Sequence, residues 1–160
     1  MSLERAKKHW KKYGLEDKII EFDTSSATVE EAAKALGCSP GEIAKTLSFL
    51  VEGKPILIVA AGDVKIDNSK YKAFFHQKAK MIPVDDVEKM IGHKVGGVCP
   101  FGILEGVEVY LDRSLQKYDV IYPTCGNSHS AVKLTIRELE ETSCYQEWIN
   151  VWKEEYYGWN

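Results

Sequence analysis

Apolar and polar residues alternate in short blocks along the chain, and each block predicts one helix or one strand. Apolar runs or strict alternation predict strands over residues 19–22, 47–51, 56–61, 107–111, 120–122 and 131–134. Helical spacing or capping residues predict helices over residues 3–13, 28–36, 40–47, 67–74, 85–91 and 135–144. Strands 47–51 and 56–61 are expected to form a hairpin, since a glycine- and proline-containing turn separates them. The mixture of hairpins and crossovers indicates one mixed α/β domain, and not a doubly wound parallel sheet.

Three capping boxes predict helix starts, and one of them bears on the position of Lys45. The segment Ser39–Glu42 has the box residues at its ends and proline at the first helical position. It predicts a helix that carries Ile43 and Leu47 on one face. Lys45 would then stand where this helix ends and the next strand begins. The other two boxes predict the helices that start after Thr28 and Thr135.

The last residues of the chain are rich in aromatic side chains. Trp148, Trp152, Tyr156 and Trp159 follow one another at helical spacing. We therefore expect residues 145–160 to form an aromatic C-terminal tail or helix, whose stripe packs against the domain.

Composition and charge limit the classes of function. The chain has 160 residues, 44% of them hydrophobic, which is enough for a single domain over residues 1–160 with its own core. Its net charge of −3 argues against a dedicated DNA-binding protein. Lysines are nevertheless concentrated in residues 1–18 and 65–80, while acids dominate from 138 onward. A local contact with RNA is compatible with this distribution, as are ordinary solvated helix faces.

Common cofactor and membrane signatures are absent from the sequence. The four cysteines lie far apart and show no zinc spacing, and there is no glycine-rich nucleotide motif, so we expect no metal and no cofactor. No run of about 20 apolar residues predicts a membrane span, and the N-terminal residues lack the apolar region of a secretory signal. A cytoplasmic protein with reduced thiols, and without a membrane partner, is the expectation.

Three segments carry candidate chemistry. Residues 96–102, Gly-Gly-Val-Cys-Pro-Phe-Gly, form a tight loop that a ligand could approach closely and whose N–H groups could bind an oxyanion. Lys45 could direct its charge at a phosphate or carbonyl group. Residues 124–129 form a polar turn between two strands and a candidate pocket rim. The alternatives are an ordinary turn for the loop and a favourable helix-dipole contact for the lysine.

Taken together, these segments resemble the YbaK/EbsC family of aminoacyl-tRNA deacylases, which includes the editing insertion domain of bacterial prolyl-tRNA synthetases. The resemblance rests on Ala-Lys-Thr-Leu-Ser-Phe around Lys45, the strand 56–61 that ends in Ala-Ala-Gly-Asp, and the loop 96–102. The later turn Gly-Asn-Ser-His at residues 126–129 also matches. The order and spacing of these motifs cover roughly residues 20–145.

The resemblance implies an α/β (α+β) fold with a mixed, largely antiparallel sheet that curls toward a barrel. It also implies trans-editing: hydrolysis of the ester of a mischarged tRNA, with Cys or Ala on tRNA-Pro as the expected substrate. The acceptor end of an aminoacyl-tRNA would be the partner, and a prolyl-tRNA synthetase a second one. The implied catalytic residues are Lys45, Gly96, Gly97 and His129, and the implied substrate-binding residues are Thr46, Val98, Cys99, Pro100, Gly126 and Asn127. His129 belongs to only some subgroups of the family.

The attacking nucleophile stays open at this point. Water, a ribose hydroxyl and a thiol of the substrate are all compatible with the residues, and attack by Cys99 is the competing account. A protein of the same fold that binds tRNA 3′ ends or a synthetase without hydrolysis is the alternative function. We expect tRNA contacts to be electrostatic and weak, centred on residues 65–80, with the N-terminal helix as a second region.

Overall fold

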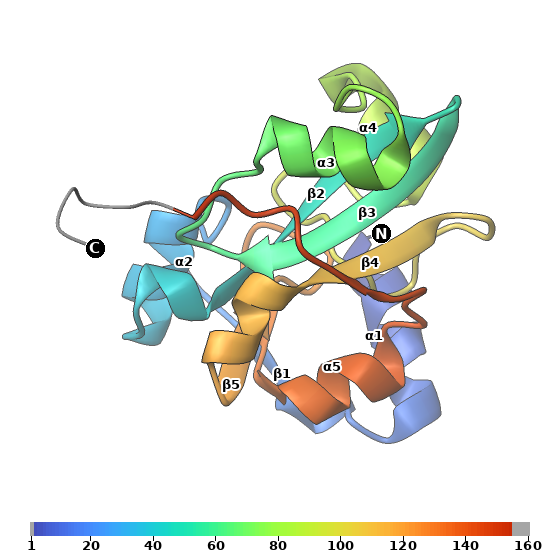
Figure 1. Cartoon of the computed structure of the whole chain (residues 1–160). Coiled ribbons are helices and arrows are strands. Elements are labelled where there is room, and N and C mark those ends of the chain that lie inside the picture. The colour runs from blue at the N-terminus through green and yellow to red at the C-terminus, as the bar shows by residue number, and fades with distance from the viewer. Residues whose placement is uncertain (1, 155–160) are drawn as a thin grey trace, which may run out of the picture.

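The fold is organised around one long antiparallel hairpin (Figure 1). The computed structural model describes residues 2–154. Strands β2 (Ile43–Val51) and β3 (Lys54–Ala61) form the predicted hairpin, and their pairing runs from Ala44 to Val51 of β2, so β2 begins earlier than predicted. The turn between them consists of Glu52 and Gly53, both with left-handed backbone angles. This geometry is typical of a two-residue hairpin turn, whose twist matches that of the strands.

Six more strands extend this hairpin into a mixed sheet or flank it. The six-stranded sheet has the order β7-β5-β2-β3-β4-β8, and its partners are β4 (Glu108–Asp112), β5 (Val120–Pro123), β7 (Leu134–Thr135) and β8 (Trp148–Ile149). The β2–β5, β3–β4 and β4–β8 pairs are parallel, and the others are antiparallel. Strands β1 (Ile19–Glu21) and β6 (Ser130–Val132) form a separate antiparallel pair. The sheet curls into a half-barrel, which confirms the predicted fold class.

Helices cover both sides of the curled sheet. They are α1 (Ser2–Tyr13), α2 (Val29–Leu36), α3 (Asn68–Phe75), α4 (Val84–Ile91) and α5 (Ile136–Thr142). Figure 1 shows α3 and α4 on one side of the β2–β3 hairpin and α1 and α5 on the other. The predicted capping boxes form at the starts of α2 and α5. No helix within residues 2–154 combines the length and apolar character needed to cross a membrane.

The core lies inside the half-barrel and includes α1. Trp10 of α1 is fully buried and packs on Phe101, with ring centroids 4.4 Å apart. Leu57 and Val59 of β3 complete this interior face, and both are fully buried. The opposite face of the hairpin is covered by α3, whose Tyr71 is also inaccessible to solvent. The N-terminal helix is therefore an integral part of the fold.

The prediction of a helix over residues 40–47 is wrong. The capping box at Ser39 does form, but only one 3-10 turn, Pro40–Glu42, follows it. Strand β2 begins directly afterwards, because Ile43 pairs with β5 and Ala44 pairs with both β5 and β3. Pairing with two neighbouring strands outweighs the local helix signal. Lys45 consequently lies within a strand and not at a helix end.

The aromatic stripe near the C-terminus is extended where the structure describes it, so the predicted helical spacing does not apply there. Trp148 belongs to β8, and Trp152 forms a β-bridge with Ile66. The N–H of Val151 donates to a carboxylate oxygen of Asp112 at 2.8 Å, which holds this segment along the sheet. Tyr156 and Trp159, the other members of the stripe, lie outside the described residues.

Candidate active site

A gap in one edge of β2 creates the candidate site. Strand β5 pairs with residues 43–44 of β2, and residues 80–82 pair with residues 48–50 further along the same edge. Two backbone hydrogen bonds hold the second segment, from Ile82 N to Ser48 O at 3.2 Å and from Leu50 N to Lys80 O at 2.8 Å. Residues 45–47 lie between the two partners, and a cavity of about 260 Å³ opens there.

The cavity is small, largely apolar and almost uncharged. Its apolar walls come from β2, α2, α4 and the loops before and after α4. Lys45 is the single charged residue among the described residues that line it. The polar groups are hydroxyls, from Ser26, Thr28, Thr46, Ser48 and Thr124. Such a cavity suits a small neutral group, because a charged one would lose its hydration without a partner.

Thr46 presents the polar groups at the gap. Its Oγ1 is buried and has no hydrogen-bond partner within the described part of the chain. The backbone groups of Ser48 and Leu50 point to this edge of β2, as their bonds to residues 80–82 show. By the alternation of an antiparallel strand, the N–H and C=O of Thr46 point to the same edge. The gap therefore presents a donor and acceptors beside the cavity.

Lys45 is a half-buried cation held by the residues that follow β3. Its ammonium group donates to the carbonyl oxygen of Gly62 at 3.4 Å and to that of Val64. Burial lowers the pKa of Lys45 below its usual value, and the nearby carboxylates of Asp63 and Glu30 oppose this shift. The protein thus keeps a directed positive charge at the rim of an apolar cavity. Charges in such partly desolvated places act more strongly on a ligand than charges in water.

Residues 96–102, called the glycine loop from here on, form another wall of the cavity. Gly96 and Val98 line it, and Gly96 has a left-handed backbone with φ of 95°. Gly97, by contrast, is not among the glycines with a left-handed backbone. A Cβ on Gly97 would lie 2.5 Å from the backbone of Asn127. Gly97 therefore allows two loops of the protein to pack against each other.

The N–H groups of this loop are not all available for a ligand. The N–H of Gly97 donates to the carbonyl oxygen of Lys94 at 2.9 Å, which closes a turn. Gly96 and Val98 line the cavity, so their N–H groups are the candidates for an oxyanion contact.

A second hollow of about 270 Å³ adjoins the first. Gly97, Gly126 and Asn127 line it, together with Leu3 at the start of α1, and Val95 lines both hollows. The structure thus brings most of the predicted site residues to two neighbouring depressions. Lys45, Thr46, Gly96 and Val98 lie at one of them, and Gly97, Gly126 and Asn127 lie at the other.

Three predicted site residues lie elsewhere. Cys99 is fully buried, with Sγ 3.6 Å from His93 Nε2, and burial raises the pKa of its thiol. Pro100 is buried as well and lines a hollow beside α1. The His129 ring is exposed and contacts the Ser128 hydroxyl at 3.1 Å, and it is not among the residues that line either depression. The structure does not bring these side chains together with Lys45.

Sequence reasoning missed the apolar wall of the cavity. Ile82, Val84 and Val87 come from the segment around α4, and Ala32 comes from α2. Their pattern resembles that of any amphipathic helix, so no local signal distinguishes them. Thr124, which belongs to the predicted pocket rim at residues 124–129, does line the cavity.

The described residues contain no group of three His, Cys, Asp or Glu side chains that could hold a metal ion.

Comparisons with known proteins agree with this arrangement. The aminoacyl-tRNA editing domain family matches residues 23–142. A Bacillus subtilis protein of unassigned function, YwhH, is 48% identical over 155 residues, which cover 96% of this chain and 99% of YwhH. The proline–tRNA ligase of Limosilactobacillus fermentum is 30% identical over 113 residues, or 66% of this chain and 20% of the ligase.

A solved structure extends the similarity to almost the whole fold. A crystal structure described as that of a candidate trans-editing enzyme for prolyl-tRNA synthetase superimposes with a TM-score of 0.85 at 25% identity. The alignment covers 96% of this chain and 98% of that one. The match therefore includes α1 and the curled sheet as well as the segments that surround the cavity. With a family match over residues 23–142 and this shared fold, the chain belongs to the aminoacyl-tRNA editing domain family.

Proposed function

We propose that this protein is a trans-editing deacylase that hydrolyses the ester of mischarged tRNA-Pro carrying Cys or Ala. The observation that carries the proposal is the small apolar cavity at the gap in β2, with the Lys45 ammonium at its rim. A small amino acid with an uncharged side chain fits an apolar cavity in which Lys45 is the one charged residue among the described lining residues. Lys45 would bind the negatively charged terminal phosphate of the tRNA or the polar carbonyl oxygen of its ester.

The physical need for such an enzyme supports the proposal. A synthetase pocket discriminates against a smaller amino acid by only ~10–200-fold, because a missing methylene removes little binding energy. A second and smaller site can then remove the products that the first site accepts. A cavity of about 260 Å³ with apolar walls is suited to this second selection.

We assign the chemistry to positioning and electrostatics. Ester hydrolysis places negative charge on the carbonyl oxygen, which the N–H groups of Gly96 and Val98 would stabilise. Lys45 would orient the tRNA end, and the hollow lined by Gly126 and Asn127 would receive the adjoining nucleotide. The attacking group would be a water molecule, a ribose hydroxyl or the substrate's own thiol. The proposal does not use the side chains of Cys99, Pro100 or His129.

The direct test is a deacylation assay with Ala-, Cys- and Ser-charged tRNA-Pro, with Pro-charged tRNA-Pro as the matched control. We expect release of a small amino acid and retention of proline. Stable binding of the charged tRNAs without release would favour the binding-protein alternative. Failure both to bind and to release would contradict the proposal and its alternative together.

A second expectation concerns Cys99. Cys99→Ser should leave the deacylation rate within about twofold of wild type, because a fully buried thiol with a raised pKa is a poor nucleophile. Stability should fall by about 1–3 kcal/mol, since a hydroxyl is costlier to bury than a thiol. Rates and denaturant midpoints of the purified variant check this. A covalent aminoacyl adduct on Cys99, or a folded but inactive variant, would instead assign the attack to this thiol.

A further inference from the structure

The N-terminal helix carries the densest positive charge of the described chain, and the editing-domain match begins only after it. Five cations, Arg5, Lys7, Lys8, Lys11 and Lys12, share the 12 residues of α1 with one carboxylate, that of Glu4. Within residues 2–154, Lys8, Lys11 and Lys12 form no ion pair, whereas Lys7 pairs with Glu21 at 3.5 Å. Burial of Ala6 and Trp10 fixes which face of the helix is exposed.

Hollows flank this basic helix on both sides. One of about 550 Å³ lies between α1 and residues 100–107, and Arg5, Lys8 and Lys12 line it. The other, of about 560 Å³, is lined by Lys7, Lys8 and Lys11. Lys8 therefore stands on a ridge between two depressions. The first hollow holds its three cations and one carboxylate, that of Glu105, so positive charge dominates it. In the second hollow Glu4, Glu16 and Glu21 balance the three lysines.

Helix α1 is physically joined to the candidate active site. Arg5 Nε donates to the carbonyl oxygen of Gly102 at 2.8 Å, at the end of the glycine loop. Leu3 lines the hollow that Gly97 and Asn127 share. The first turn of α1 therefore lies against the site loops, and the remaining turns extend from there over a helix about 18 Å long.

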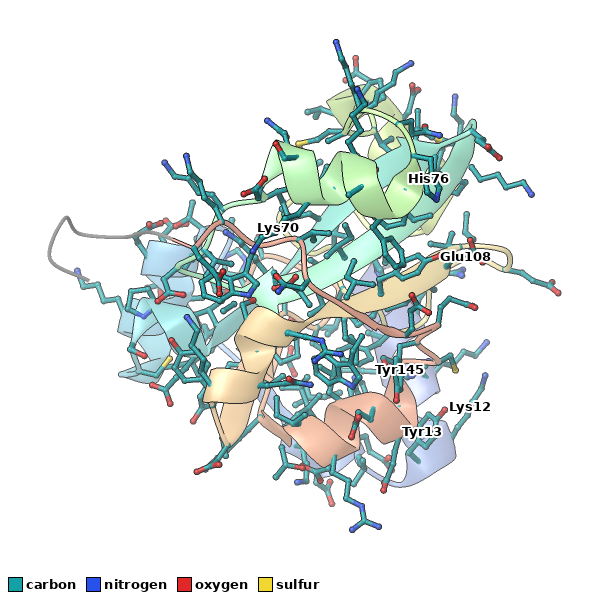
Figure 2. The ribbon with its side chains drawn as sticks, viewed as in Figure 1. Lys12, Tyr13, Lys70, His76, Glu108 and Tyr145 are labelled. Atoms are coloured by element: carbon teal, nitrogen blue, oxygen red, sulfur yellow. The ribbon has the colours of Figure 1, made fainter. Side chains whose placement is uncertain are left out.

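The other lysine-rich segment is less suited to a large anion. Lys70 already contacts Asn150, the carbonyl oxygen of Trp152 and Glu154. Helix α3, which carries it, covers the face of the hairpin opposite the barrel interior. Figure 2 shows Lys70 and His76 far from Lys12 and Tyr13, which project from the end of α1. The two lysine-rich helices, α1 and α3, therefore lie on opposite sides of the β2–β3 hairpin.

We infer that α1 docks the double-stranded acceptor stem of the tRNA whose 3′ end enters the cavity. This inference rests on the proposed function. Proteins recognise duplex RNA chiefly by its shape and phosphates, and a row of unpaired lysines beside hollows supplies such contacts. The single-stranded end would reach the site past Leu3, while the first base pairs lie along Lys8, Lys11 and Lys12. This places the main RNA contact on α1 and not on residues 65–80.

The test compares two triple variants with the same change in charge. One is Lys8→Gln/Lys11→Gln/Lys12→Gln on α1, and the other is Lys72→Gln/Lys78→Gln/Lys80→Gln on the rival segment. Glutamine keeps helix propensity, so the α1 variant should fold, and thermal unfolding verifies this. The probe is an uncharged RNA minihelix of the acceptor stem with its CCA end, and its binding is titrated at several salt concentrations.

We expect the α1 variant to bind the minihelix about tenfold more weakly, with a log K against log salt slope shallower by about 2–3. The rival variant should change the slope by less than about 1. Equal slopes in the two variants, or a larger change in the rival, would overturn the inference.

Activity separates this inference from the proposed function. On mischarged full-length tRNA, the α1 variant should lose more kcat/KM than on an aminoacylated CCA trinucleotide, which lacks the duplex. Equal losses on both substrates would overturn duplex docking while leaving deacylation intact. Absence of any deacylation by the wild-type protein would contradict the proposed function, and the minihelix titration would still decide the role of α1.

Discussion

Replacing Lys45 with alanine should lower the deacylation rate at least about 100-fold, the scale of losing one preorganised charge-stabilising group. The fold should survive, because the side chain contributes two hydrogen bonds to the carbonyl oxygens of Gly62 and Val64, worth about 1 kcal/mol each at a partly exposed position. Initial rates on mischarged tRNA, with thermal unfolding of the same samples, measure both quantities.

Two companion variants make the Lys45 result specific. Lys45→Met keeps the apolar stem and removes the charge, so it should be as inactive as Lys45→Ala. Lys54→Ala removes an exposed lysine from the far end of the same hairpin and should leave the rate unchanged. A folded Lys45→Ala protein with full activity would remove Lys45 from the mechanism.

Gly97→Val should reduce turnover by about 100-fold or more, for a reason that the sequence alone did not suggest. A Cβ at this position would lie 2.5 Å from the backbone of Asn127, so the glycine loop and the turn 126–127 must separate. That separation displaces Gly96 and Val98, which line the cavity. Displacements of about 1 Å can cost 10²-fold in rate. Overpacking should also lower stability by about 1–3 kcal/mol.

Gly106→Ala is the matched control for a glycine in the same connecting loop. Gly106 has φ of 93°, but a Cβ there meets no atom within 4 Å. The Gly106→Ala substitution should therefore lower the free energy of unfolding by about 1 kcal/mol through backbone strain, without affecting turnover. Gly97→Ala, the smallest possible addition, should lie between this control and Gly97→Val. Wild-type turnover in a folded Gly97→Val protein would show that the loop packing does not position the site.

The sequence by itself determined those elements whose signals lie within a few residues. Thr28 with Glu31, and Thr135 with Glu138, predicted the starts of α2 and α5, because a capping box satisfies the first N–H groups of a helix locally. The hairpin of β2 and β3 followed from two apolar segments joined by a turn. Lys45 and the glycine loop were also identifiable, since their motifs resemble those of a known family.

Other features depended on contacts between distant segments. The capping box at Ser39 is of the same kind as that at Thr28, yet only a single turn follows it, because Ile43 and Ala44 pair with strands from elsewhere in the chain. Trp152 has helical spacing but lies extended, because the neighbouring Val151 binds Asp112 across the sheet.

The candidate site itself was decided only by the tertiary structure. Its cavity exists because two segments about 40 residues apart, β5 and residues 80–82, pair with the same edge of β2 and leave residues 45–47 uncovered between them. No local pattern encodes such a gap. Backbone edges are satisfied by whichever strand reaches them, so the position of the opening depends on long-range pairing. The sequence identified the reactive residue types, and the pairing of distant strands determined which of them share the cavity.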